Sequence, residues 1–199
     1  MRTVVAALLL AAPAHAAVLV DYGTVPGSTG LTIAGTADQF GGFAAFQPFT
    51  VTDPQGWIID TVTLFGGRDS DPANQGASLA FYAELAPSTP DFANPIGTRT
   101  AFFQNSQSLS TIPFINVTLP QGRYYFGFAP NSPGYLGAWY ASQMSDPANR
   151  AVTRRLTAGT YIVQNQTMTM RIDGVVAPAP GASLALLAGT LAYARRRRV

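Results

Sequence analysis

Leu119-Pro-Gln-Gly-Arg-Tyr-Tyr-Phe-Gly-Phe128 is the stretch of sequence that best indicates the fold. Its Pro-Gln-Gly segment has the composition of a tight turn. Aromatic residues then follow at Tyr124, Phe126 and Phe128, every second position, which is the spacing of a β-strand with one buried face. The stretch therefore predicts a turn that leads directly into a strand of the hydrophobic core.

The same alternation of apolar and polar residues continues through the chain. It recurs at residues 78–85, where Leu79 and Phe81 are expected to face inward, at 115–119, where Ile115 is expected to be buried, and at 167–172. Further short runs rich in aromatic and β-branched residues predict strands at 18–22, 43–51, 57–65, 99–103, 135–140 and 160–163. About ten strands separated by Pro- and Gly-rich turns predict an all-β fold, a two-sheet β-sandwich of jelly-roll or immunoglobulin-like kind.

One region fits two kinds of structure. Ser145-Asp146-Pro147 can cap and begin a helix that ends at Gly159. The same residues also fit a strand. Both alternatives stay open from the sequence alone.

The first residues have the layout of a secretory signal peptide. A basic start, Met1-Arg2-Thr3, precedes a short apolar run and the small residues Ala14 and Ala16, so cleavage by signal peptidase is expected just before Ala17. We therefore expect residues 1–16 to be removed and residues 17–174 to form one exported domain.

The other end of the chain has the layout of a membrane segment. From Ala177 to Ala194 there are eighteen residues without a charge, which as a helix would extend about 27 Å, close to the ~30 Å of a hydrocarbon core. Four arginines then follow, and positive residues remain on the cytoplasmic side. The tail, residues 175–199, thus predicts a transmembrane helix that holds the domain outside the inner membrane.

This tail resembles a known sorting signal. The Pro-x-Pro motif, the apolar run at 183–194 and the basic cluster are similar to the PEP-CTERM sorting domain of Gram-negative, exopolysaccharide-producing bacteria; the residues concerned are Pro178, Ala179, Pro180, Arg195, Arg196, Arg197 and Arg198. Ala179 stands where that motif has Glu. The resemblance implies recognition by an exosortase, a membrane transpeptidase that cuts near Pro-x-Pro and removes the helix and the arginines. A permanent membrane anchor is the alternative. The stretch 119–128 is also similar to a strand of the extracellular sandwich domains that accompany such tails.

Composition excludes several classes of function. The domain between the two ends has seven arginines against ten acids, a net charge of −3, and the chain has no lysine, so nucleic acid is not an expected partner. The only histidine, His15, lies in the signal peptide, and there is no cysteine. Catalysis by Ser-His-Asp or Cys-His groups and the usual catalytic zinc sites are therefore excluded. Glu84, the only glutamate, is expected to be a surface charge, and we predict that the protein is not an enzyme.

Two weaker sites remain. Asp69, Asp71 and Asn74 gather oxygen ligands on an expected loop and could hold calcium, although turn formation alone explains them; no other cofactor is expected. Trp57, Tyr135 and Trp139 could stack against sugar rings, or they could fill the core.

These observations predict a surface or extracellular-matrix protein with a structural or adhesive role in exopolysaccharide or biofilm. Its expected partners are signal peptidase, an exosortase-like transpeptidase and exopolysaccharide, with the membrane as a transient one. The alternative is a carbohydrate-binding module that recognises a specific glycan.

Overall fold

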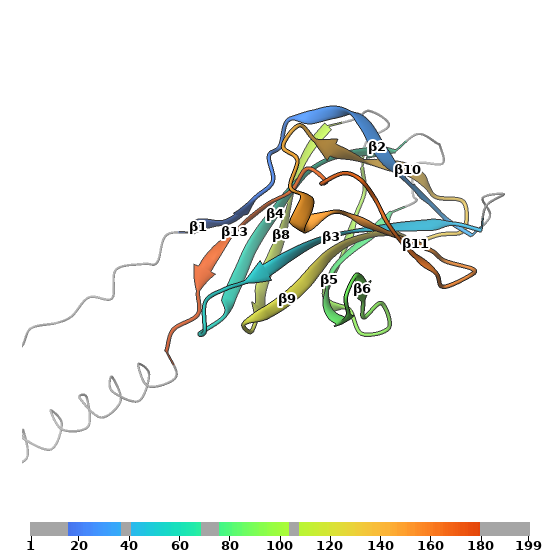
Figure 1. Cartoon of the computed structure of the whole chain (residues 1–199). Coiled ribbons are helices and arrows are strands. Elements are labelled where there is room, and N and C mark those ends of the chain that lie inside the picture. Colours follow the sequence, from blue (N-terminus) through green and yellow to red (C-terminus); the bar gives the residue numbers. More distant parts are fainter. Residues whose placement is uncertain (1–15, 37–40, 69–75, 104–107, 180–199) are drawn as a thin grey trace, which may run out of the picture.

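The computed structural model describes residues 16–36, 41–68, 76–103 and 108–179, and these form an all-β sandwich, which confirms the predicted fold class (Figure 1). The strand pairs between its elements are antiparallel. The first layer contains β3 (Phe43–Val51), β5 (Ala77–Ala86), β6 (Thr89–Pro90), β7 (Ile96–Ala101), β9 (Gly122–Pro130), β11 (Val152–Arg155) and β12 (Tyr161–Val163). The second contains β1 (Ala17–Asp21), β2 (Pro26–Ala34), β4 (Trp57–Arg68), β8 (Ser108–Leu119), β10 (Leu136–Ser142) and β13 (Arg171–Val176).

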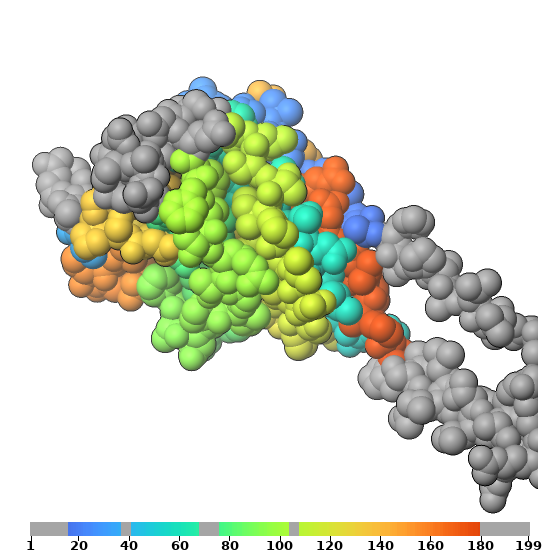
Figure 2. Space-filling model, turned by 180° about the vertical axis from the view of Figure 1, so that it is seen from behind, coloured from blue at the N-terminus to red at the C-terminus, as the bar shows by residue number. Residues whose placement is uncertain are grey.

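Strand pairing arranges each layer around a central strand. In the first layer the order is β12-β11-β3-β9-β5, with β6 and β7 both beside β5. In the second layer β4 pairs with β8 on one side and with β13 and β10 on the other, and β1 and β2 follow as outer strands. Figure 2 shows β8, β4 and β13 side by side on the surface. The layers join at one margin, where Ala34 of β2 pairs with Phe43 of β3.

Aromatic rings fill the space between the layers. Phe126 of β9 lies 5.3 Å from Phe81 and 5.8 Å from Trp139 of the opposite layer, measured between ring centroids. Phe81 in turn contacts Phe114 of β8 at 5.0 Å. The side chains of all four residues are fully buried. Burial of this kind is the dominant favourable term in folding, and the chain has no disulfide to supplement it.

The expectation of one buried face per strand is wrong for β5 and β9. The alternation places Tyr82, next to Phe81, and Tyr125, next to Phe126, on the opposite, polar face. Both are buried, because a second hydrophobic cluster covers the outer side of the first layer. We call this second group the outer cluster; its buried members are Ala44, Phe46, Ala80, Tyr82, Tyr125, Ala129 and Val152. Phe92 and Tyr161 pack over it from the segments that follow β6 and β11. The first layer is therefore apolar on both faces.

The burial expected for Ile115 is also wrong, since 68% of this residue is exposed. Asn116 beside it has a left-handed backbone with φ of 65°, and the pairing of β8 with β4 shifts register at this point. The resulting bulge turns two consecutive residues outward and returns Val117 to the core together with Phe114.

Residues 145–159, which fit both a helix and a strand by sequence, form a short 3-10 turn followed by a strand. Asp146 caps a single 3-10 turn, η1 (Pro147–Asn149), by accepting a hydrogen bond of 3.0 Å from the backbone N–H of Ala148. The chain then enters β11, because that segment pairs with β3 and β12. A helix continuing to Gly159 is not present.

The beginning and the end of the domain lie together at one end of the sandwich (Figure 1). Ala17 of β1 pairs with Gly174 of β13. The sheet extends to Val176, beyond the expected boundary at 174, and the N–H of Ala177 still donates to the carbonyl of Gly56 at 2.9 Å. In the described parts of the chain, every strand pair and both hydrophobic clusters lie within residues 17–177, so this domain has its own hydrophobic core.

Replacing Phe126 by Ala tests the inter-layer packing. We expect Phe126→Ala to lower the free energy of unfolding by about 3–5 kcal/mol, since it leaves a cavity among three rings. Phe102, which is 67% exposed, provides the matched control, and Phe102→Ala should change that free energy by less than about 0.5 kcal/mol. Urea unfolding of the 17–177 domain measures both, and equal effects would contradict the layered core.

Candidate functional site

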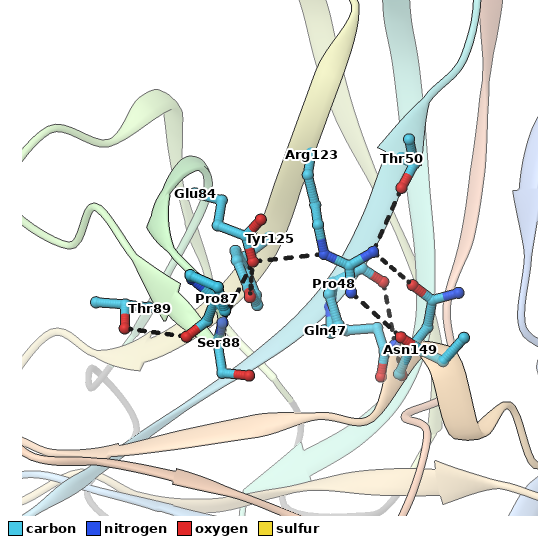
Figure 3. Close-up of polar contacts among 11 residues, drawn as sticks. Gln47, Pro48, Thr50, Glu84, Pro87, Ser88, Thr89, Arg123, Tyr125 and Asn149 are labelled. Carbon is cyan, nitrogen blue, oxygen red and sulfur yellow. Dashed lines mark hydrogen bonds and ion pairs between the residues drawn. The ribbon is translucent and has the colours of Figure 1, made fainter.

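Polar side chains gather beside the outer cluster, where β3, β5 and β9 meet the η1 turn (Figure 3). We call them the polar network; its members are Gln47, Thr50, Glu84, Arg123, Tyr125 and Asn149. It combines an ion pair with several side-chain hydrogen bonds, which makes it a candidate site.

Glu84 lies at one side of the network. Its carboxylate accepts a hydrogen bond of 2.8 Å from the hydroxyl of Tyr125 and one of 3.3 Å from the backbone N–H of Ser88. The same oxygen, Oε1, is 3.5 Å from Nε of Arg123. The sequence predicts a solvated surface charge at Glu84. In the structure Glu84 is only partly exposed and contacts Tyr125 and Arg123. The carboxylate satisfies the phenol of a buried ring and neutralises a guanidinium.

Arg123 connects Glu84 to the η1 turn. Its Nη1 donates to Oγ1 of Thr50 at 3.4 Å and to Oδ1 of Asn149 at 3.3 Å, while Nη2 donates to the carbonyl of Ala148 at 3.2 Å. Asn149 is held from its other side by Asp146, whose carboxylate accepts from Nδ2 at 2.7 Å. Arg123 thereby fastens the turn to the first layer.

Gln47 continues these contacts into the interior. The side chain is completely buried, and its Nε2 donates to the carbonyl of Asn149 at 2.7 Å while its Oε1 accepts from the backbone N–H of Met168, also at 2.7 Å. The Gln47 amide thus satisfies one backbone group at Asn149 and one at Met168. Neither of these two residues is paired with β3. Buried polar groups are costly when unpaired, so Gln47 fixes the path of both segments.

The pKa of the Tyr125 hydroxyl is raised to about 12. Burial is the largest cause, followed by the hydrogen bond to Glu84 and the negative charge of that carboxylate, while Arg123 acts in the opposite direction. Burial also raises the pKa values of Tyr22 and Tyr82 to about 12. All three phenols are therefore neutral near pH 7, and Tyr125 serves as a hydrogen-bond donor.

Five aspartates of the described residues are engaged in local structure. Asp21, Asp53 and Asp146 accept from backbone N–H groups of their own turns, Asp91 accepts from Asn94, and Asp173 forms an ion pair of 2.8 Å with Arg171. Glycoside hydrolysis by carboxylates needs two acids about 5–10 Å apart across a cleft. The polar network supplies one carboxylate bound to a phenol and a guanidinium, an arrangement suited to holding the turn in place.

Of the two alternatives for Trp57, Tyr135 and Trp139, the structure supports the core position, because all three rings are buried; a glycan contact at these residues is wrong. Trp57, Tyr135 and Trp139 all belong to the hydrophobic core between the layers. Trp139 also donates from Nε1 to the carbonyl of Thr169 at 2.8 Å, which satisfies the polar edge of its ring inside the protein. None of the three presents a face on which a sugar could stack.

Several predicted residues lie outside the described residues. These are the calcium candidates Asp69, Asp71 and Asn74, and the sorting residues Ala14, Pro180 and Arg195 to Arg198. Of the sorting residues within the described ranges, Ala16, Ala17, Pro178 and Ala179 are exposed. In the part of the chain that the structure describes there is no group of three His, Cys, Asp or Glu side chains that could hold a metal, and no helix long and apolar enough to cross a membrane.

The sequence did not identify the polar network, but one of its members carried a signal. Gln47 is the lone amide in the otherwise apolar run at 43–49, and an amide in a buried strand requires partners. Arg123, Thr50 and Asn149 are ordinary strand and turn residues whose proximity depends on tertiary structure. Comparison of the chain with protein-family models and with curated proteins finds no match.

The raised pKa of Tyr125 predicts a loss of stability at alkaline pH. A raised pKa in the folded protein favours the protonated phenol, so its contribution is complete below pH 10 and is lost as the pH rises from 10 towards 12. Urea unfolding between pH 8 and pH 11 should therefore show a smaller decrease for Tyr125→Phe than for the unchanged chain. Identical pH dependence of the two would contradict burial of this hydroxyl.

Removal of the Gln47 amide tests the internal bridge. Gln47→Leu leaves the carbonyl of Asn149 and the N–H of Met168 without their partner, which we expect to lower the free energy of unfolding by about 2–4 kcal/mol. Gln55→Leu, in an exposed turn, is the matched control and should cost less than about 0.5 kcal/mol. A similar small effect of both substitutions would show that the bridge is not needed.

Proposed function

We propose that the protein is exported, is sorted through its C-terminal tail by an exosortase-like transpeptidase, and has a structural or adhesive role at the cell surface or in the exopolysaccharide matrix. The observation that carries the proposal is the order of three features at the end of the sequence: Pro178-Ala179-Pro180, an uncharged apolar run, and four arginines. The signal-peptide layout at the beginning of the chain predicts the same orientation, with the domain outside.

The limits of the folded domain support this proposal. The expected signal-peptidase product begins at Ala17, which is the first residue of β1. At the other end, Ala177 makes the last backbone hydrogen bond seen in the described residues, and the Pro-x-Pro motif begins at the next residue. Both processing sites therefore adjoin the fold without interrupting a strand. Ala16 and Pro178 are exposed, as access by membrane enzymes requires.

The interior also favours a structural role over glycan recognition. A binding module would use exposed aromatic rings, whereas Trp57, Tyr135 and Trp139 are core residues. The polar network joins five segments of the domain through its own hydrogen bonds: β3, β5, β9, the η1 turn and the segment at Met168. Both features stabilise the sandwich.

The mass of the cell-associated protein in its host tests the proposal. We expect a species that begins at Ala17 and ends near Pro180, because both ends are predicted to be cut. Replacing Arg195 to Arg198 by serine should yield a species that keeps its tail, since the stop-transfer charges are then missing. Intact-mass spectrometry of the unchanged and substituted chains measures both.

Other masses would contradict particular steps. A membrane-bound species that starts at Ala17 and retains Arg198 would indicate a permanent anchor and overturn the processing step. A cytosolic species that retains both Met1 and Arg198 would overturn export itself.

A further inference from the structure

β12 lies at the margin of the first layer and, among the strands that the structure describes, pairs on one side only. Its described strand pairing is with β11, through Val152 with Val163, Thr153 with Ile162 and Arg154 with Tyr161. Ile162 and Val163 are about half exposed, at 49% and 51%. From Leu156 to Met170 the sequence has no charged residue, and the strand itself consists of aromatic and β-branched residues. An uncharged edge of this composition is a template for pairing with another strand.

Other marginal strands carry features that oppose such pairing. β8 contains Pro113 and the bulge at Asn116, and the carbonyl of Ile115 already accepts from Nη2 of Arg99 at 3.4 Å. β6 has two residues, one of them Pro90, and β1 is interrupted by a shift of register and ends in an exposed aspartate. Prolines, bulges and charges are the usual means by which proteins protect sheet edges. β12 has no proline, bulge or charge, and only its length of three residues limits pairing at this edge.

The direction of the backbone groups of β12 follows from its hydrogen bonds with β11. The carbonyl of Thr160 accepts from Arg155, and the N–H of Gln164 donates to Ala151. Because hydrogen-bonding groups alternate between the two sides of an antiparallel strand, Thr160, Ile162 and Gln164 direct theirs towards β11. Tyr161 and Val163 consequently direct their N–H and C=O groups towards the free edge.

We propose that β12 is a self-association edge, and that two copies of the chain join through antiparallel pairing of their β12 strands. The pairing places Tyr161 of one copy opposite Val163 of the other, with Ile162 facing its own counterpart on a two-fold axis. In this register Tyr161 and Val163, whose backbone groups point outward, both form hydrogen-bonded pairs with the β12 strand of the second copy. A shift by one residue to either side would bring in Gly159, whose φ is +68°, or Asn165, which lies beyond the strand.

A second copy is the occupant that this edge fits best, because the strand is its own antiparallel complement. It has no charge that would call for an opposite charge on a different partner. Closed two-fold contacts are also the commonest arrangement of identical chains. β12 is short, so the contact comprises four backbone hydrogen bonds and the apolar side chains beside them. We therefore expect a weak dimer, suited to a protein concentrated on a surface, and this holds whether or not the tail is processed.

A single introduced cysteine tests the register, since the chain has none of its own. In the proposed pairing the two copies of residue 162 form a non-hydrogen-bonded pair with Cα atoms about 4.5 Å apart, within the range that a disulfide can bridge. The full chain carrying Ile162→Cys should form disulfide-linked dimers under mild oxidation, several-fold more than Val18→Cys. Val18 is the matched control, because it is 48% exposed and lies on another marginal strand, β1. Equal yields, or no dimer from either variant, would overturn the proposal.

Sedimentation equilibrium of the 17–177 domain provides the second test. The unchanged domain should form dimers as its concentration rises towards about 1 mM. Ile162→Lys places two like charges opposite each other and should weaken dimerisation by about tenfold or more, whereas Val18→Lys should leave it unchanged. Circular dichroism confirms that each variant is folded. A domain that stays monomeric throughout, or equal weakening by both lysines, would show that β12 does not mediate self-association.

Discussion

The structure depends on the burial of both faces of its first layer. β9 shows this most clearly, because Phe126 enters the core between the layers while its neighbour Tyr125 enters the outer cluster. A tyrosine buried in this way needs a partner for its hydroxyl, and Glu84 supplies it. Arg123 then neutralises Glu84 and holds the η1 turn. The polar network is thus a consequence of packing an aromatic strand on both sides.

The strands that could be predicted are those whose pattern is local. The turn and strand at 119–128 and the run at 43–51 appear in the structure much as the sequence indicates, because alternation and turn chemistry are properties of neighbouring residues. β2 escaped prediction since its first residues are Pro, Gly, Ser and Thr, and pairing with β10 makes it a strand. The burial of Tyr82 and the exposure of Ile115 depend on a covering segment and on a bulge, neither of which periodicity reveals.

The same distinction applies to function. Sorting signals act as linear sequence, so residue order alone supports the prediction of export and sorting from the two ends, which stays a prediction. A site whose residues come together only in the folded chain could not be predicted in this way. The partners of Gln47, Asn149 and Met168, lie more than a hundred residues away along the chain. For aromatic residues the sequence leaves two roles open, because a tryptophan such as Trp139 suits both a core and a sugar-binding face, and only its three-dimensional neighbours decide between them.

The account finally requires that the sandwich reside outside the cell without its tail. Labelling of intact cells of the host, with one antibody against the folded domain and another against residues 181–199, tests this most directly. We expect the domain antibody to label the surface of unpermeabilised cells. The tail antibody should not detect the mature protein, either before or after permeabilisation. Detection of the domain only after the cytoplasm is opened, together with the tail, would contradict the account.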